Sequence, residues 1–376
     1  MFSKKVVITS FFLILIVVFC FSLIAVSQIR PVSKEEFQKA QQEFNKLKEL
    51  INQKLAKMNE AKENEDPEYY QKYKQEYEEL VKQAEKWKKV LQDYQVYITE
   101  INKIKKLYME GQTATKLKRY PEALKKYDSC IKRGEKLNVD ELKDTLTKAY
   151  YQKGYVLSRL RKYNEAIKAY EMSKTIDPEN YRAYFGLGAA FDKINKNKES
   201  VNSYLKAIEI NPKFSRARYN LAVVQLKKFK NSDEALKTLE ELFATASNPN
   251  DNRTLSNGYA LKGQILYNLR KFNEAIPSLK KSIELNKALW KSYYLLGDIY
   301  YTLGKNQEAI NYATQCLKHR RGYGGAYIVR GRAYKKMGNE TKALKEFRMA
   351  LKDRTWQKMA QYEIDLIKNK DKYINQ

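Results

Sequence analysis

Small and bulky apolar residues recur along most of this chain with the spacing of packed helices. Between residues 104 and 355, a Gly or Ala is followed about twelve residues later by a small residue, and about four residues after that by a bulky one. Gly154/Ala166/Tyr170 and Gly188/Ser200/Tyr204 are clear copies. The small residues let two antiparallel helices approach closely, and the bulky residue fills the ridge between them. The pattern predicts helix pairs that stack on one another.

The repeat is about 34 residues long, and we expect seven copies. Their predicted starts lie near residues 104, 147, 181, 215, 256, 290 and 324. Pro178 and Pro212 precede two of these starts, as expected for a residue that suits the first turn of a helix. Repeats of this length with Gly and Ala at these positions resemble the tetratricopeptide repeat family. The resemblance implies an α-solenoid with a concave surface that binds other molecules.

A different pattern fills residues 31–103, where apolar side chains recur every seven residues. One row reads Phe37, Phe44, Ile51 and Met58, and a later row reads Tyr73, Leu80, Trp87, Tyr94 and Ile101. Sustained heptads are typical of coiled coils. Because Asp66 and Pro67 interrupt the pattern, we expect a coiled-coil helical hairpin. Such a hairpin also offers a surface for a homo-oligomer.

The first residues of the chain predict a membrane segment. Residues 6–27 are almost entirely apolar and follow Lys4 and Lys5. About 20 apolar residues suffice to cross a bilayer, so we expect a transmembrane anchor within residues 1–30. A cleaved signal peptide is the alternative, because small residues around Ala25 form an acceptable cleavage site. With the lysines inside, the predicted location is the cytoplasmic membrane, single-pass, with the C-terminal domain on the periplasmic or extracytoplasmic side.

The end of the chain predicts one more amphipathic helix, marked by Trp356, Met359 and Tyr362. A solenoid needs an end cap to cover its last apolar face. The predicted fold class is therefore all-α, with four parts in order. These are a transmembrane helix within residues 1–30, a coiled-coil helical hairpin at 31–103, a solenoid of seven tetratricopeptide helix pairs at 104–355, and a C-terminal capping helix with a tail at 356–376.

Residues suited to catalysis are scarce. The sequence has one histidine, His319, and three cysteines. Cys20 falls in the apolar segment, whereas Cys130 and Cys316 occupy a small-residue position in repeats far apart and are predicted to be buried thiols. We therefore predict a binding protein that is not an enzyme and uses no cofactor or metal.

The distribution of basic residues along the chain indicates where the predicted binding surface lies. The formal net charge is +28, yet residues 33–110 contain 16 basic and 16 acidic residues, so the excess lies mainly in the repeats. The second position of each repeat is basic in five of seven copies, where the family usually has an acidic residue. The fifth position is mostly aromatic, and the thirteenth is often Lys, as in an average repeat. The predicted groove consists of Lys105, Tyr108, Lys148, Tyr151, Arg182, Phe185, Arg216, Tyr219, Lys291 and Tyr294. A solvated charged face is the alternative.

These features predict a membrane-tethered protein–protein interaction scaffold. Its basic, aromatic-lined groove would hold partner proteins with acidic or extended segments in a bacterial envelope assembly, with residues 6–27 in the inner membrane. The layout resembles spirochaete-type periplasmic tetratricopeptide repeat proteins, some of which belong to the flagellar motor collar. The alternative is a binding module for an anionic non-protein ligand, such as lipid head groups or a cell-wall polymer. A nucleic acid is a weaker fit, because the predicted location places the groove outside the cytoplasm.

Overall fold

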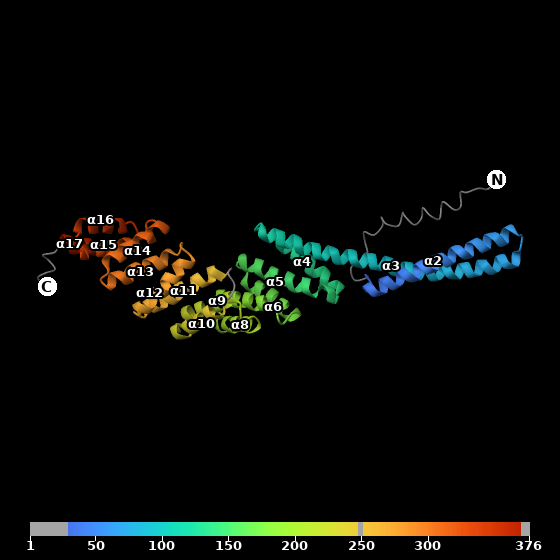
Figure 1. The fold of residues 1–376 in the computed structure, drawn as a ribbon, viewed down its shortest axis with the longest axis horizontal. Helices are drawn as coiled ribbons and strands as arrows, with labels where there is room; N and C mark the ends of the chain where they lie inside the picture. Colours follow the sequence, from blue (N-terminus) through green and yellow to red (C-terminus); the bar gives the residue numbers. More distant parts are fainter. Residues whose placement is uncertain (1–28, 247–250, 370–376) are drawn as a thin grey trace. The chain divides into compact units, whose positions relative to one another are not determined.

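The computed structural model describes residues 29–246 and 251–369. These residues form sixteen α-helices and one short 3-10 helix (Figure 1). The chain divides into two compact units, Met1–Pro178 and Glu179–Gln376. Each unit contains a hydrophobic core of its own.

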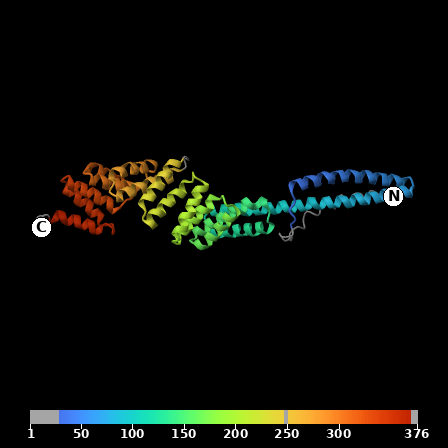
Figure 2. The same ribbon diagram turned by 90° about the horizontal axis from the view of Figure 1, so that it is seen from below.

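The first unit begins with two long antiparallel helices, α2 (Lys34–Glu63) and α3 (Pro67–Lys116), which pack along one another (Figures 1 and 2). The side chains of Ser33 and Asp66 cap the two helices by accepting hydrogen bonds from backbone N–H groups three residues further on. Such caps satisfy donors that the first turn of a helix leaves open. The helical hairpin predicted from the heptads is present as a pairing within one chain. The described residues give no support to a coiled coil between copies.

Apolar and aromatic residues join the two arms of this hairpin. Phe37 on α2 stacks on Tyr94 on α3, with ring centroids 4.2 Å apart, and Ala40, Leu47 and Ala84 are buried between the helices. The small alanine side chains allow the helix backbones to lie close together.

Helix α3 belongs both to the hairpin and to the first repeat. It has 50 residues and continues without interruption through the predicted repeat start near residue 104. Ile104, Gly111 and Ala114 in its last part are buried against α4 (Tyr120–Leu137). The second arm of the hairpin and the first helix of the first repeat are thus the same helix, α3.

A short 3-10 helix and one further helix pair complete the first unit. After α4 come η3 (Asp140–Leu142), α5 (Lys143–Arg159) and α6 (Tyr163–Ile176). Their shared core includes Tyr127 and Leu142, both fully buried.

The second unit contains five helix pairs and a final helix. The pairs are α7 (Tyr181–Lys193) with α8 (Asn197–Ile210), α9 (Ser215–Phe229) with α10 (Ser232–Thr245), α11 (Asn252–Asn268) with α12 (Phe272–Leu285), α13 (Trp290–Thr302) with α14 (Asn306–His319), and α15 (Gly324–Lys336) with α16 (Glu340–Ala350). Helix α17 (Gln357–Lys368) packs on α15 and α16, the place expected for a cap.

The glycines of the repeat explain why the two helices of a pair lie so close. A Cβ atom added to Gly188 on α7 would lie 2.7 Å from the ring of Tyr204 on α8, and one added to Gly263 on α11 would lie 2.5 Å from Leu279 on α12. Carbon atoms in contact normally lie at least about 3.5 Å apart. The small-to-bulky contact predicted from the spacing is therefore confirmed at these pairs.

The predicted membrane anchor requires a correction. Within residues 29–246 and 251–369, every helix is either too short or too polar to cross a membrane. The long helices α2 and α3 carry charged residues along their whole length, and a charge within a bilayer is costly. Residues 6–27, to which the prediction refers, lie outside the described residues. For the described residues, the supported fold class is an all-α repeat solenoid in which no helix could span a membrane, and single-pass location in the cytoplasmic membrane is not supported.

The two cysteines of the described residues are buried thiols, as predicted. Cys130 on α4 and Cys316 on α14 are both free and fully buried. Burial raises the pKa of each thiol to about 12. They act as small core residues.

Candidate partner-binding groove

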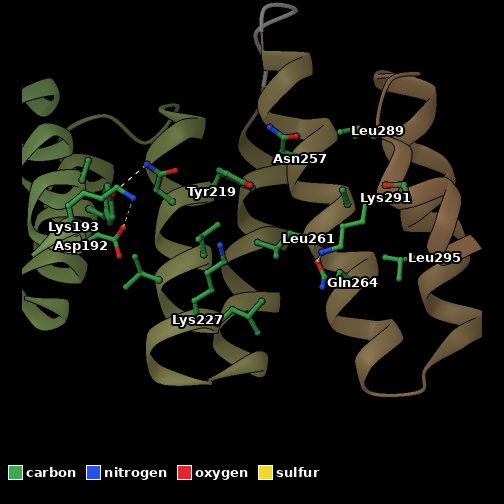
Figure 3. Close-up of a pocket in the computed structure, with 18 residues that line it drawn as sticks. Asp192, Lys193, Tyr219, Lys227, Asn257, Leu261, Gln264, Leu289, Lys291 and Leu295 are labelled. Atoms are coloured by element: carbon green, nitrogen blue, oxygen red, sulfur yellow. Dashed lines mark hydrogen bonds and ion pairs between the residues drawn. The ribbon is translucent and has the colours of Figure 1, made fainter. Parts of the chain in front are cut away.

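A groove crosses the first helices of four consecutive pairs in the second unit (Figure 3). Its cavity measures about 580 Å³ and is lined from α7, α9, α11 and α13, with Tyr204 added from α8. Stacked pairs bring their first helices side by side on one wall of a solenoid, so that a surface assembled from several repeats results.

Three lysines and one aspartate supply the charge of the groove lining, a net charge of +2. The Nζ atom of Lys193 lies 3.6 Å from Asp192, whose other carboxylate oxygen lies 3.8 Å from Lys228. Lys227 forms no ion pair with any of the described residues, and Lys291 donates a hydrogen bond of 2.9 Å to Oε1 of Gln264. Two positive charges of the groove therefore have no carboxylate partner in the described structure.

The two uncompensated lysines influence each other. They extend into the groove from α9 and α13, on either side of α11 (Figure 3). Burial, and in second place the positive charge of Lys227, lower the pKa of Lys291. Both causes disfavour the charged form of Lys291. An anion bound in the groove would stabilise this charged form.

Apolar and amide groups complete the surface. Val223, Leu261 and Leu295 form what we call the apolar floor, with the side-chain amides of Asn257 and Gln264 beside it. Amides can donate hydrogen bonds to a peptide backbone and accept them from it, whereas the floor can cover an apolar side chain. A few polar groups around an apolar surface are typical of binding sites.

Tyr219 stands at the α9 side of the groove and is partly buried. Burial raises the pKa of its hydroxyl group. The phenol is therefore neutral at physiological pH and can donate or accept a hydrogen bond.

Of the ten residues predicted for the groove, Tyr219 and Lys291 line this cavity. Arg182 lies over the ring of Tyr181 and donates a hydrogen bond of 3.2 Å to its hydroxyl group. Phe185 packs against Phe214, with ring centroids 5.0 Å apart.

The remaining two predicted residues of the second unit lie outside the cavity lining. Arg216 is exposed near the start of α9. Tyr294 packs edge-on against Tyr323 and Trp356, with centroid distances of 5.2 Å and 6.0 Å.

Four predicted groove residues belong to the first unit. The Nζ atoms of Lys105 and Lys148 form ion pairs with carboxylates, 3.7 Å from Glu141 and 2.6 Å from Asp144. The rings of Tyr108 and Tyr151 pack near Tyr127 and Tyr170, at centroid distances of 6.2 Å and 5.8 Å. In this unit the predicted cations are thus compensated and the predicted aromatics contribute to packing.

The predicted groove did not include the two amides or the lysine of α9. Lys227 occupies the thirteenth position of its repeat, where Lys is too common to attract attention. Asn257 and Gln264 occupy second and ninth positions that carry other residue types in the neighbouring repeats. Their register alone places all three on the first helices, and this is the signal that could have found them.

Comparison with protein families agrees with this architecture. Models of the tetratricopeptide repeat match residues 147–180 and 294–358, and a TPR repeat model matches residues 190–228. A model described as anaphase-promoting complex, cyclosome, subunit 3 matches residues 231–316. The search of curated proteins found no match.

One solved structure shows the same fold at low sequence identity, and two others match this chain with lower scores. PilF of Pseudomonas aeruginosa is 18% identical, with a TM-score of 0.51 over 61% of this chain and 99% of that one. YrrB, described as a TPR protein with an unusual peptide-binding site, is 19% identical, with a TM-score of 0.45 over 52% of this chain and 97% of that one. MamA is 21% identical, with a TM-score of 0.42 over 48% and 96%.

The fold and the groove define a helical repeat solenoid, a class whose concave surfaces serve for binding. The matching family models identify the repeat, so the chain carries tetratricopeptide repeats.

Proposed function

We propose that this chain is a protein–protein interaction module whose second unit binds an extended segment of a partner protein in the groove of α7, α9, α11 and α13. The observation that supports this best is the pair Lys227 and Lys291, which face an apolar floor and amide groups without a carboxylate partner among the described residues. A segment with negative charge and apolar side chains fits this combination.

The mixture of groups favours a peptide over an anionic lipid head group or polymer. Such ligands would use the lysines but would leave the apolar floor and the amides of Asn257 and Gln264 without a function. A peptide supplies carboxylates, apolar side chains and backbone hydrogen-bonding groups together.

The groups of the lining are suited to binding rather than to catalysis. They are ammonium, amide, phenol, hydroxyl and aliphatic groups, with one aspartate already paired to lysine. The hydroxyl group of Ser292 accepts a hydrogen bond of 2.8 Å from Ser282. A nucleophile activated by a neighbouring base, the usual requirement for covalent catalysis, is not found among the lining residues. The membrane tether, the envelope assembly and the motor collar expected from the sequence gain no support from the described residues, and they form no part of the proposal.

A photocrosslinking experiment in cells tests this function. A photoreactive phenylalanine analogue replaces Tyr219 in the groove or, as the control, Lys237, which is exposed on α10. We expect a discrete protein adduct from position 219 alone, and we expect its yield to fall strongly with Lys227→Glu but not with Lys237→Glu. Equal adducts from both positions, or an adduct insensitive to Lys227→Glu, would contradict the proposal.

A further inference from the structure

The geometry of the groove points to the chemical class of its ligand. We infer that Lys227 and Lys291 together receive one Asp or Glu side chain of the bound segment, and that an apolar side chain two residues away in that segment lies on the apolar floor. This inference rests on the proposed function and specifies what the partner must present.

Two lysines reach the groove from different helices. Lys227 reaches in from α9 and Lys291 from α13, with Leu261 of α11 between them (Figure 3). The nearby carboxylate of Asp192 is already shared by Lys193 and Lys228. Both ammonium groups therefore line the groove without a carboxylate partner among the described residues, and a carboxylate has two oxygens, one to accept a hydrogen bond from each.

The amide of Gln264 supports the arrangement by directing Lys291. Its Oε1 atom accepts one hydrogen bond from the Nζ atom at 2.9 Å. An ammonium group has three donors, so two remain for a ligand. A lysine whose position is already fixed loses less side-chain entropy on binding than a free one.

The position of Lys227 argues for a carboxylate over a phosphate group. Lys227 lies in the last turn of α9, which ends at Phe229. The C-terminal end of a helix carries a partial negative charge, and this charge repels a dianion more strongly than a monoanion. A carboxylate carries a single negative charge and fits this setting better.

The apolar floor sets the neighbouring residue of the ligand. Val223, Leu261 and Leu295 lie on three successive first helices beside the lysines. In an extended segment, residues i and i+2 point to the same side. The expected motif is therefore an acidic residue, any residue, and then an aliphatic residue.

The test uses short random peptides with blocked ends, because the partner is unidentified. One library fixes Glu and, two residues later, Leu. A matched library carries Gln in place of Glu, a third carries phosphoserine there, and a fourth carries Gln with a free C-terminal carboxylate. Retention of each library is measured on the immobilised full chain and on three variants, Lys227→Gln/Lys291→Gln, Lys291→Arg and Lys237→Gln.

The wild-type chain is expected to retain the Glu library about tenfold better than the Gln library, the usual effect of a hydrogen bond to a charged group. The double variant is expected to lose this preference, whereas Lys291→Arg and Lys237→Gln keep it. Circular dichroism checks that each variant has the helicity of the wild type.

Each other outcome overturns a defined part of the argument. Equal retention of the Glu and Gln libraries overturns the carboxylate site but leaves a peptide-binding groove intact. A preference for phosphoserine or for the free C-terminus overturns the side-chain carboxylate as ligand. No retention of any library, together with no adduct at position 219 in cells, overturns the proposed function as well.

Discussion

Arg133 on α4 binds Glu100 on α3 with two parallel hydrogen bonds. Its Nε and Nη2 atoms donate to Oε1 and Oε2 of Glu100, each at 2.5 Å. The planar guanidinium group matches both oxygens of a carboxylate. Glu100 is 6% exposed, so this ion pair is one of the few polar links within the core of the first unit.

Removal of Arg133 should destabilise the first unit. Arg133→Met leaves the Glu100 carboxylate buried and unpaired, which costs more than the pair itself contributes. Because Arg133 is partly exposed, we expect a loss of about 2 kcal/mol in the free energy of unfolding. Urea unfolding followed by circular dichroism measures it.

The matched control is Lys143→Met, which removes an exposed ion pair with Asp140 at 2.9 Å. Exposed pairs contribute about 0–1 kcal/mol, so this variant should unfold close to the wild type. The double change Glu100→Leu/Arg133→Leu should recover most of the loss. Equal effects of Arg133→Met and Lys143→Met would contradict this account of the buried pair.

The close contact between Gly188 and Tyr204 predicts a second effect. Gly188→Ala places a methyl group against a fully packed ring and should cost about 1–3 kcal/mol, as overpacking does. Gly297 is the control, since a Cβ atom there would meet its nearest neighbours at 3.3 Å. Gly297→Ala should stay within about 1 kcal/mol of the wild type, because alanine also favours the helix. Thermal unfolding compares them, and the reverse order would be inconsistent with the packing described.

A third prediction concerns the two lysines of the groove. Lys227→Met removes a positive charge that lowers the pKa of Lys291, so the pKa of Lys291 should rise. NMR titration of ¹³C-methylated lysines measures this directly, with Lys237→Met as the control. No change in the pKa of Lys291 would show that the two charges do not meet in the groove.

The same lysine has a consequence for stability. The pKa of Lys291 is lower in the folded state than in the unfolded state. Folding therefore releases protons when the pH lies near or above the folded pKa and below the unfolded one. The free-energy cost of the charged form of Lys291 is therefore fully present while the group is charged in both states, and it decreases as the pH rises through its folded pKa. Lys227→Met should reduce this pH dependence.

The buried thiols predict a loss of stability in alkali. An unfolded cysteine ionises near pH 9, whereas burial raises the pKa of Cys130 to about 12. The unfolded state therefore loses its proton first, and the free energy of unfolding should fall between about pH 9 and pH 12, by up to about 1.4 kcal/mol per pH unit for each thiol. Cys130→Ala should make this slope shallower in urea unfolding at several pH values. An identical slope in both proteins would refute the assignment.

The packing of the repeats could be predicted from the sequence because it depends on spacing along the chain. Gly188 and Tyr204 are sixteen residues apart in the sequence. Their contact follows from this spacing and from the geometry of packed helices. Buried cysteines follow for the same reason. The hairpin could be predicted as well, since Asp66 and Pro67 mark its turn.

The groove could not be predicted to the same extent. The register identifies which residues lie on first helices, but not which cations already have partners. Lys105 and Lys148 form ion pairs with carboxylates that no repeat rule specifies. Conversely, Lys227 becomes notable only because its surroundings in the described structure lack a carboxylate partner. Pairing of charges depends on side-chain geometry, which the repeat pattern does not encode.

The continuity of α3 has a mechanical consequence. With 50 residues, this helix is a rod about 75 Å long, with its first half paired to α2 and its last part built into the core of the first repeat. A hinge between hairpin and repeat would absorb a pull or a twist applied at the tip near Pro67. An unbroken helix instead works as a lever that passes the load to Ile104 and Ala114, and so into the first repeat.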